Sequence, residues 1–373
     1  MSGIYIHIPF CQSRCIYCDF YSTLYLDKRE TYVEQLIQEM HSRKEELPES
    51  SRTYHTIYIG GGTPSTLSPR TLQYLLQSTT DIFPISNDAE ITIEANPDDV
   101  TTEWVRKLKD TPVNRISMGI QTFDDNLLKF LNRRHNSQQA LDAVKHLQEA
   151  GYNNISIDLI YGIPGQDEKR WKEDVEKAIT LNIPHLSAYS LMYEEGTQLT
   201  TLKEKGKIDE VNEETSLWCY DYLCKRLSEE QYEHYEISNF ARQDYHSKHN
   251  SGYWEGIPYL GFGAGAHSYD GARIRRWNEG NVQAYSENGP SYETEELTDV
   301  DLYNEYIMTR LRTRKGISLQ ELYDKFGKKA YDYCLKQSKS HLQQGNLRQM
   351  GHILSLTHRG IFISNQVMSD LFR

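Results

Sequence analysis

Six short apolar segments, separated by longer stretches with helical periodicity, constrain the fold of this chain more than any other feature. The segments are rich in β-branched residues and cover Ile4–Ile8, Thr56–Ile59, Ile91–Ala95, Arg115–Ile120, Ile155–Tyr161 and His185–Leu191. Between them, apolar residues recur at helical spacing, for example at Tyr32, Leu36 and Met40. Six repeats of a strand followed by a helix predict a parallel sheet with right-handed crossovers. The predicted fold class is therefore α/β, in the form of a partial (β/α)6 barrel.

The same pattern divides the 373 residues into three regions. Residues 1–201 form the predicted barrel. Residues 202–290 extend it with a helix at Glu214–Glu230, followed by a segment rich in glycine and aromatic residues. Residues 291–373 predict a small winged-helix-like domain. Its predicted helices cover Leu302–Arg312, Leu319–Phe326 and Tyr331–Gln344, and a hairpin follows through Ile353–Ile363.

Charge and cysteine usage narrow the class of protein. The formal net charge of −12 argues against a dedicated nucleic-acid binder, because such proteins carry a basic face. Three of the six cysteines lie within eight residues, and the scattered Cys219, Cys224 and Cys334 do not complete a disulfide framework. The sequence shows no signal-peptide pattern, and no run approaches the roughly 18 apolar residues of a membrane span. We therefore expect a reduced, cytoplasmic protein without an integral membrane segment.

Cys11, Cys15 and Cys18 form a C-x3-C-x2-C motif directly after the first predicted strand. Three thiolates can hold three irons of a [4Fe–4S] cluster and leave the fourth iron open to a small molecule. A partial zinc site is one alternative, but structural zinc sites use four protein ligands and no fourth Cys or His follows at zinc spacing. Three structural cysteines are the other alternative. The tight spacing without a closing ligand favours the open-site cluster.

Polar residues and glycines gather where the later predicted strands end. Taken singly, each is typical of a turn, a cap or a surface position. Together they predict a ring of polar groups at one mouth of the barrel, where parallel strands place their ligands. Carboxylates suit an ammonium group or ribose hydroxyls, and guanidinium suits a carboxylate, so the ring fits a zwitterionic, hydroxyl-rich ligand. These residues are Gly60–Pro64, Glu94, Gln121, Arg133, Arg134 and Asp158.

In this combination the chain resembles the radical S-adenosylmethionine (SAM) superfamily. The resemblance rests on the cysteine loop after a first strand, an aromatic residue before the last cysteine, the GGGTP sequence and the glutamate of the third strand. Tyr5–Cys11 and Gly60–Pro64 further resemble the branch that contains oxygen-independent coproporphyrinogen III oxidase. The resemblance implies that Cys11, Cys15 and Cys18 bind the cluster. It also implies a SAM site lined by Tyr5, Tyr17, Gly61, Gly62, Thr63, Glu94, Gln121, Arg133 and Asp158.

Three features separate this sequence from the oxidase. The oxidase continues its motif with a fourth cysteine, where this chain has Phe20, and it carries an N-terminal extension that this sequence lacks. The sequence His249–Trp254 (HNSGYW) resembles the H-N-x-x-Y-W pattern linked with heme in the HemW-type heme chaperones. From its chemistry alone His249 is more typical of a structural histidine, and the resemblance is what favours heme. His246 and His267 remain open as alternative ligands.

We therefore expect a heme chaperone on a radical-SAM scaffold, with a [4Fe–4S] cluster, SAM and heme as its ligands. It would deliver heme to acceptor proteins, in particular respiratory enzymes, and would need an electron donor for the cluster. In this interpretation the cluster and SAM would serve regulation or assembly, and net catalytic turnover is not required. Two alternatives stay open: a coproporphyrinogen III oxidase performing radical decarboxylation, and a radical enzyme acting on another substrate.

Overall fold

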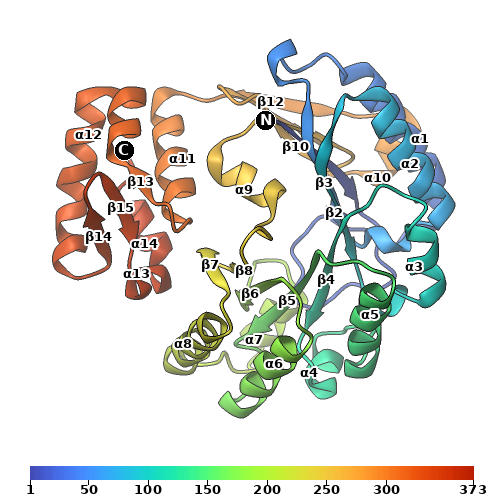
Figure 1. Ribbon diagram of the computed structural model, residues 1–373, viewed down its shortest axis with the longest axis horizontal. Coiled ribbons are helices and arrows are strands. Elements are labelled where there is room, and N and C mark those ends of the chain that lie inside the picture. Colours follow the sequence, from blue (N-terminus) through green and yellow to red (C-terminus); the bar gives the residue numbers. More distant parts are fainter.

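The computed structural model describes the whole chain, residues 1–373. Its central element is a twelve-stranded sheet in which six parallel strands stand side by side in sequence order (Figure 1). These strands are β1 (Gly3–Ile8), β2 (Tyr54–Gly61), β3 (Ile85–Ala95), β4 (Arg115–Gln121), β5 (Ile155–Tyr161) and β6 (His185–Ser190). The six predicted strands and the α/β class are confirmed.

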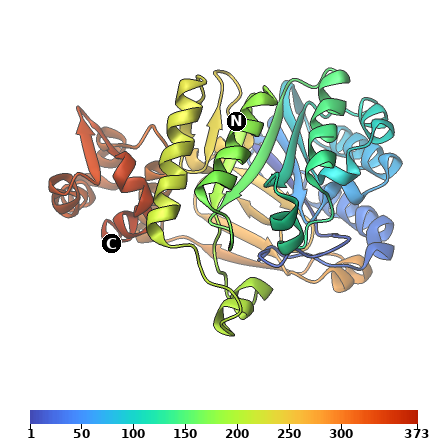
Figure 2. The ribbon, with the colours of Figure 1, turned by 90° about the horizontal axis from the view of Figure 1, so that it is seen from below.

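Helices connect the parallel strands and cover the outer face of the sheet (Figures 1 and 2). Several begin at a capping side chain: Ser68, Asp124, Asn136 and Asp167 each accept a hydrogen bond from a backbone amide of the first turn. The helices are α1 (Arg29–Arg43), α2 (Pro69–Ile82), α3 (Thr102–Leu108), α4 (Asp125–Phe130), α5 (Ser137–Glu149) and α6 (Glu168–Thr180). Short 3-10 turns occur at Leu26–Lys28, Glu49–Ser51, Pro64–Thr66 and Pro97–Asp99.

Strand β4 illustrates how the barrel separates an apolar layer from a polar interior. Ile116, Met118 and Ile120 are fully buried in the main apolar core. The alternate positions from Arg115 to Gln121 line a cavity on the opposite face. Because successive side chains of a strand point to opposite faces, one strand serves both layers. A strand of this kind holds polar groups inside the protein on a rigid support.

Further strands extend both edges of the parallel sheet. Strand β9 (Tyr259–Phe262) pairs in parallel with β1, and β10 (His267–Tyr269), β11 (Ile274–Asn278) and β12 (Tyr292–Glu296) continue that edge. At the other edge β8 (Asn239–Ala241) pairs antiparallel with β6, and β7 (Glu233–Glu236) follows. The sheet stays open between β7 and β12. The glycine- and aromatic-rich segment therefore supplies edge strands, which its sequence did not predict, together with helices α7 (Gln198–Glu204), α8 (Glu213–Glu229), α9 (Lys248–Glu255) and α10 (Val282–Asn288).

The last part of the chain has its own apolar core, which includes Tyr303, Leu322 and Leu354. Its elements are α11 (Asp299–Leu311), β13 (Ile317–Ser318), α12 (Leu319–Gln343), β14 (Leu347–Met350), β15 (Ile353–Leu356), α13 (His358–Phe362) and α14 (Ser364–Asp370). This part lies beside α8 (Figure 2). There, His358 stacks on Tyr220 with ring centroids 5.1 Å apart. A non-helical Gly327, with φ +77°, divides α12 into the two helices that the sequence predicted.

One prediction in this part was wrong in extent. The hairpin formed by β14 and β15 ends at Leu356, and His358–Phe362 is helical instead of extended. The cause is Thr357, whose side chain accepts a hydrogen bond from the amide of Gly360 at 3.0 Å and so caps a new helix.

None of the helices combines the length and the apolar character that a bilayer span requires.

Candidate functional site

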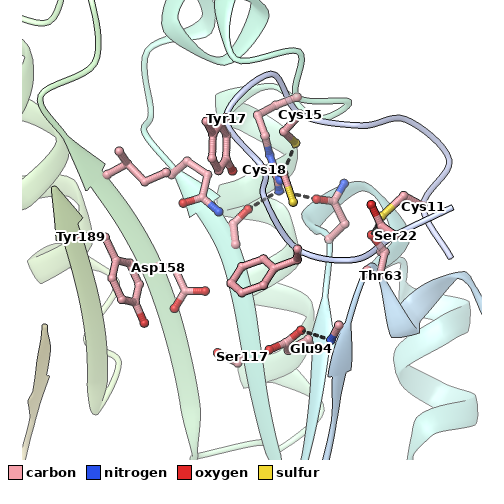
Figure 3. A pocket seen from close by; sticks show the side chains of 18 of the residues that line it. Cys11, Cys15, Tyr17, Cys18, Ser22, Thr63, Glu94, Ser117, Asp158 and Tyr189 are labelled. Carbon is pink, nitrogen blue, oxygen red and sulfur yellow. Dashed lines mark hydrogen bonds between the residues drawn. The ribbon is translucent and has the colours of Figure 1, made fainter. Parts of the chain in front are cut away.

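A cavity of about 380 Å³ lies where the loop between β1 and α1 crosses the parallel strands (Figure 3). The loop supplies Cys11, Cys15 and Cys18 on one side, and the strands supply Glu94 and Asp158 on the other. The structure brings all the residues predicted for the cluster and SAM into this lining except Tyr5: Cys11, Cys15, Tyr17, Cys18, Gly61, Gly62, Thr63, Glu94, Gln121, Arg133 and Asp158. Residues spread over about 150 positions of sequence thus face one space.

The three cysteine thiols are unpaired and partly enclosed by protein. Thr63 Oγ1 donates a hydrogen bond to Cys11 Sγ at 3.6 Å, and Arg133 Nη1 donates one to Cys15 Sγ at 3.3 Å. Burial raises the pKa of Cys18 to about 11 and raises the pKa of Cys11 as well. The thiols do not converge on one point, as the ligands of a single metal ion would. A [4Fe–4S] cluster binds each thiolate through a different iron, so this all-sulfur donor set fits a cluster better than zinc.

The glycines after β2 are needed for close packing under the cysteine loop. A Cβ on Gly61, whose φ is +115°, would lie 2.7 Å from the ring of His7. A Cβ on Gly62 would lie 2.7 Å from the carbonyl carbon of Pro9, directly before the loop. The amide of Gly61 also donates a hydrogen bond to Glu94 Oε2 at 3.0 Å. This turn therefore sets the distance between the loop and the carboxylate.

Two carboxylates face the same cavity with raised proton affinity. Burial raises the pKa of Glu94 to about 7, although the hydroxyl of Tyr58 donates a hydrogen bond to Oε1 at 2.7 Å. The negative charge of Asp158 acts in the same direction as burial. Burial likewise raises the pKa of Asp158 to about 6. Each carboxyl group therefore gains or loses its proton near neutral pH. When ionised, the two groups accept hydrogen bonds from hydroxyl or ammonium groups of a ligand.

Arg133 links the cysteine loop to the strand ends. Its guanidinium donates to Cys15 Sγ, to Asn96 Oδ1 and, at 2.5 Å, to the carbonyl oxygen of Gly119. Burial lowers its pKa, but the neighbouring Tyr17 and Cys15 outweigh that effect, so the net pKa is raised and Arg133 stays charged. Gln121 ends the strand at a bulge with φ +72°, and Gly119 leaves room for its side-chain amide.

Tyr5 and His249 lie outside this cavity lining. The hydroxyl of Tyr5 forms a 2.9 Å hydrogen bond with His7 Nδ1, and its ring stacks on Tyr58 and His249 with centroids 6.2 and 6.4 Å apart. Tyr5 therefore stands behind Tyr58, which does line the cavity, and touches the site through that ring.

His249 lies in the first turn of α9, which carries the His249–Trp254 sequence and is called the motif helix below, and it is only 4% exposed. Its Nδ1 lies 2.8 Å from Thr56 Oγ1, and its Nε2 lies 2.9 Å from the hydroxyl of Tyr253. Burial, together with the smaller effect of the positive charge of Arg115, lowers the pKa of His249 to about 3. The ring is therefore neutral, with both nitrogens engaged, so binding a metal through it requires one of these hydrogen bonds to open.

The histidines left open as heme ligands divide between two places. His246 and His249, together with Tyr253, line a second cavity of about 280 Å³. His267 lies on β10 and stacks on Trp277 with centroids 5.8 Å apart. Trp254, the last residue of the motif, points elsewhere: Arg312 stands over its ring at 5.2 Å. The motif helix thus contacts both the barrel and the C-terminal part.

Several cavity residues escaped the sequence analysis, chief among them Asn96, Arg115, Ser117, Ser187, Tyr189 and Asn250. Arg115 and Ser117 were assigned to a strand but not to a site. The signal that could have identified them is alternation, because they share one face of β4 with Gly119 and Gln121.

Comparisons with known proteins agree with this geometry. The sequence profile of the Radical SAM superfamily matches residues 5–178, and that of the HemN C-terminal domain matches residues 297–363. Coproporphyrinogen III oxidase (HemN) from Escherichia coli, described as a radical SAM enzyme, superposes with a TM-score of 0.85. The match covers 100% of this chain and 90% of that chain at 22% sequence identity, so it shows a shared fold.

Curated relatives match over nearly the full length. The chain is 37% identical to the heme chaperone HemW of Lactococcus lactis subsp. lactis (strain IL1403), with 98% of this chain and 96% of the relative covered. It is 35% identical to the heme chaperone HemW of Bacillus subtilis (strain 168), with 98% of each chain covered. The chain therefore belongs to the radical SAM superfamily and, within it, to the HemW family.

Proposed function

We propose that this protein is a heme chaperone that binds a [4Fe–4S] cluster, SAM and heme, and that it passes heme to acceptor proteins such as respiratory enzymes. Membership of the radical SAM superfamily implies the cluster and SAM, and the name of the relatives supports heme. The observation that carries the proposal is the cavity in which three thiols face two carboxylates and a guanidinium.

The residues of the cavity divide the work of holding the cluster and SAM. Cys11, Cys15 and Cys18 would bind three irons, and the bound cluster would supply an open iron and, from an external electron donor, one electron. Arg133 donates a hydrogen bond to Cys15 Sγ, so it would position that thiolate and balance its negative charge. Glu94 and Asp158 would accept hydrogen bonds from the hydroxyl or ammonium groups of SAM, while Gly61 and Gly62 keep the backbone close.

Heme is the proposed cargo, and His249 is its proposed ligand. The hydroxyl of Tyr253 covers Nε2, so a rotation of Tyr253 away from the ring would free that nitrogen. Thr56 would keep its hydrogen bond to Nδ1 and hold the ring in place, as partners of metal-binding histidines do. His246 lines the same cavity and is the alternative ligand there.

Phe20 separates the proposal from its enzymatic alternative. It lines the mouth of the cavity and is 66% exposed. An apolar ring at this position offers no ligand to iron, where the oxidase has a fourth cysteine. We therefore expect no conversion of coproporphyrinogen III.

The cluster is tested by anaerobic reconstitution with iron and sulfide, followed by absorbance and iron analysis. Cys11→Ala, Cys15→Ala and Cys18→Ala should each lose the cluster absorbance. Cys224→Ala is the matched control, because this thiol lies on α8, away from the cavity, and its loss should leave the iron content unchanged. Full iron in all three loop variants would refute the assignment.

A further inference from the structure

The cavity under the cysteine loop extends beyond the polar groups at the carboxyl ends of the strands, toward the amino end of β4. Strand β4 lines it with four alternate residues, Arg115, Ser117, Gly119 and Gln121. Six residue steps of a strand span about 20 Å. Gln121, at the carboxyl end of β4, lies near the cysteine loop, and Arg115 lies at the opposite end of the cavity. A ligand bound at the carboxyl ends of the strands would not reach Arg115.

Arg115 is a buried cation without a partner. It is 1% exposed, and its side chain makes no hydrogen bond and no ion pair within 4.0 Å in the protein and has a buried, unsatisfied Nε. The charge of Arg115 acts on Glu94 and Asp158 across the cavity and partly offsets the rise that burial causes in the pKa of both, but neither carboxylate lies within ion-pair distance of its guanidinium. A buried charge without partners is costly, so proteins normally pair it. Its guanidinium therefore has unused donors in a space that is accessible to a ligand.

Asn250 adds a second unused polar group to the same end. It follows His249 on α9, and its side-chain amide lines the cavity with no hydrogen-bond partner in the protein. The charge of Arg115 also acts on the ring of His249. This end of the cavity therefore adjoins the motif helix.

The mouth of the cavity has the opposite character. Phe20 on the cysteine loop and Tyr189 and Met192 at and after the end of β6 line the cavity and are 66, 41 and 62% exposed, so they face its solvent-accessible side. Exposed apolar side chains that gather at one opening favour an apolar ligand surface. An apolar mouth and a cationic floor together fit an amphipathic molecule that carries a carboxylate on a flexible arm.

We propose that Arg115 and Asn250 form a carboxylate-binding subsite at the floor of the cavity, which anchors an acidic side arm of the cargo. Guanidinium binds a carboxylate through two parallel hydrogen bonds, and the Asn250 amide adds a third donor. The inference rests on heme as the cargo of the proposed chaperone but not on His249 as its ligand, because Arg115 lines the first cavity and His249 the second; the arms are then the two propionates of heme. The carboxylate of SAM is the competing source of the same chemistry, and the experiment separates the two.

The test titrates the reconstituted native protein with hemin and with hemin dimethyl ester, whose propionates are neutral, and measures SAM by equilibrium dialysis. Native protein should bind hemin at least tenfold more tightly than the ester. Arg115→Gln should abolish that difference and leave SAM affinity within about twofold, and Asn250→Ala should reduce the difference in part. Arg106→Gln, which removes an exposed arginine from α3, is the control and should change nothing.

The outcomes are distinct. Equal binding of hemin and its ester by native protein overturns the subsite and leaves the heme-chaperone function standing. The subsite is also overturned if Arg115→Gln loses SAM affinity and still binds hemin more tightly than the ester. In that case Arg115 binds the carboxylate of SAM and not that of heme. Failure of native protein to bind either porphyrin refutes the proposed function itself. If thermal unfolding shows that Arg115→Gln does not fold, the native comparison and Asn250→Ala decide the question.

Discussion

The pKa of Glu94 predicts opposite pH trends for folding and for SAM binding. In the folded protein this pKa is about 7, against an ordinary value of 4.5. Because the folded state holds the proton more tightly, the contribution of Glu94 to stability is full below pH 4.5 and is lost as the pH rises through about 7. SAM hydroxyl or ammonium groups need the ionised carboxylate, so affinity should rise over the range in which this stability falls.

The magnitude follows from the ionised fraction. With a pKa of about 7, Glu94 is roughly one-tenth ionised at pH 6 and roughly nine-tenths ionised at pH 8, so SAM affinity should rise up to about tenfold. Tenfold is the upper limit for the contribution of Glu94 alone, because Glu94 faces a cavity open to water. Tyr58, Asp158 and Arg115 are the other titratable or charged groups acting on it, and Asp158, with its pKa of about 6, adds to the rise at its lower end.

The assay is equilibrium dialysis of SAM against reconstituted protein from pH 6 to pH 8, beside thermal unfolding of the unliganded protein over the same range. Glu94→Gln should bind SAM more weakly at pH 8 and with a much flatter pH profile. Asp158→Asn should keep most of the rise above pH 7, which separates the two carboxylates. A native affinity that is constant over this range, or a Glu94→Gln profile as steep as the native one, would show that the ionised Glu94 does not bind SAM.

Two further predictions concern packing. Gly62→Ala should destabilise the protein by about 1–3 kcal/mol and impair cluster reconstitution, because its Cβ meets the Pro9 carbonyl carbon at 2.7 Å; thermal unfolding and iron content measure both effects. Gly252→Ala is its control inside α9, where the nearest side-chain atom lies at 3.8 Å, and unchanged stability in both variants would contradict the reasoning. Arg43→Met should lower the free energy of unfolding by about 3 kcal/mol in denaturant titration, because it removes the cation that lies 2.6 Å from the buried Glu39 carboxylate and leaves that charge only its hydrogen bonds from Gly263, Asn278 and Tyr285. Glu39→Gln combined with Arg43→Met should recover part of that loss, and a double variant no more stable than the single one would argue against the stranded charge.

The parallel strands and most of the cavity lining were predictable from the sequence for a physical reason. Parallel strands covered by helices are buried on both faces, so they give continuous apolar runs, and their carboxyl ends share one edge. Glu94 and Asp158 could therefore be placed together although 64 positions separate them. The cysteine motif was visible because its three cysteines lie within eight residues of one another.

Other features depend on contacts that no local pattern records. The edge strands β7 to β12 are three to five residues long and include glycines and charged residues, so they carry no clear period. The surroundings of His249 depend on Thr56, which lies 193 positions earlier in the chain. Arg115 stood in an apolar run and was assigned to a strand alone. Its lack of a partner is a property of the whole barrel interior, and only the structure shows it.

Anaerobic titration of the reconstituted protein with hemin, followed by a coproporphyrinogen III assay on the same sample, tests the central claim most directly. The heme-chaperone account predicts stoichiometric hemin binding, weakened by His249→Ala, and no protoporphyrinogen formation. Protoporphyrinogen formation without retention of hemin would contradict it and would identify an oxidase that works without the fourth cysteine of its motif.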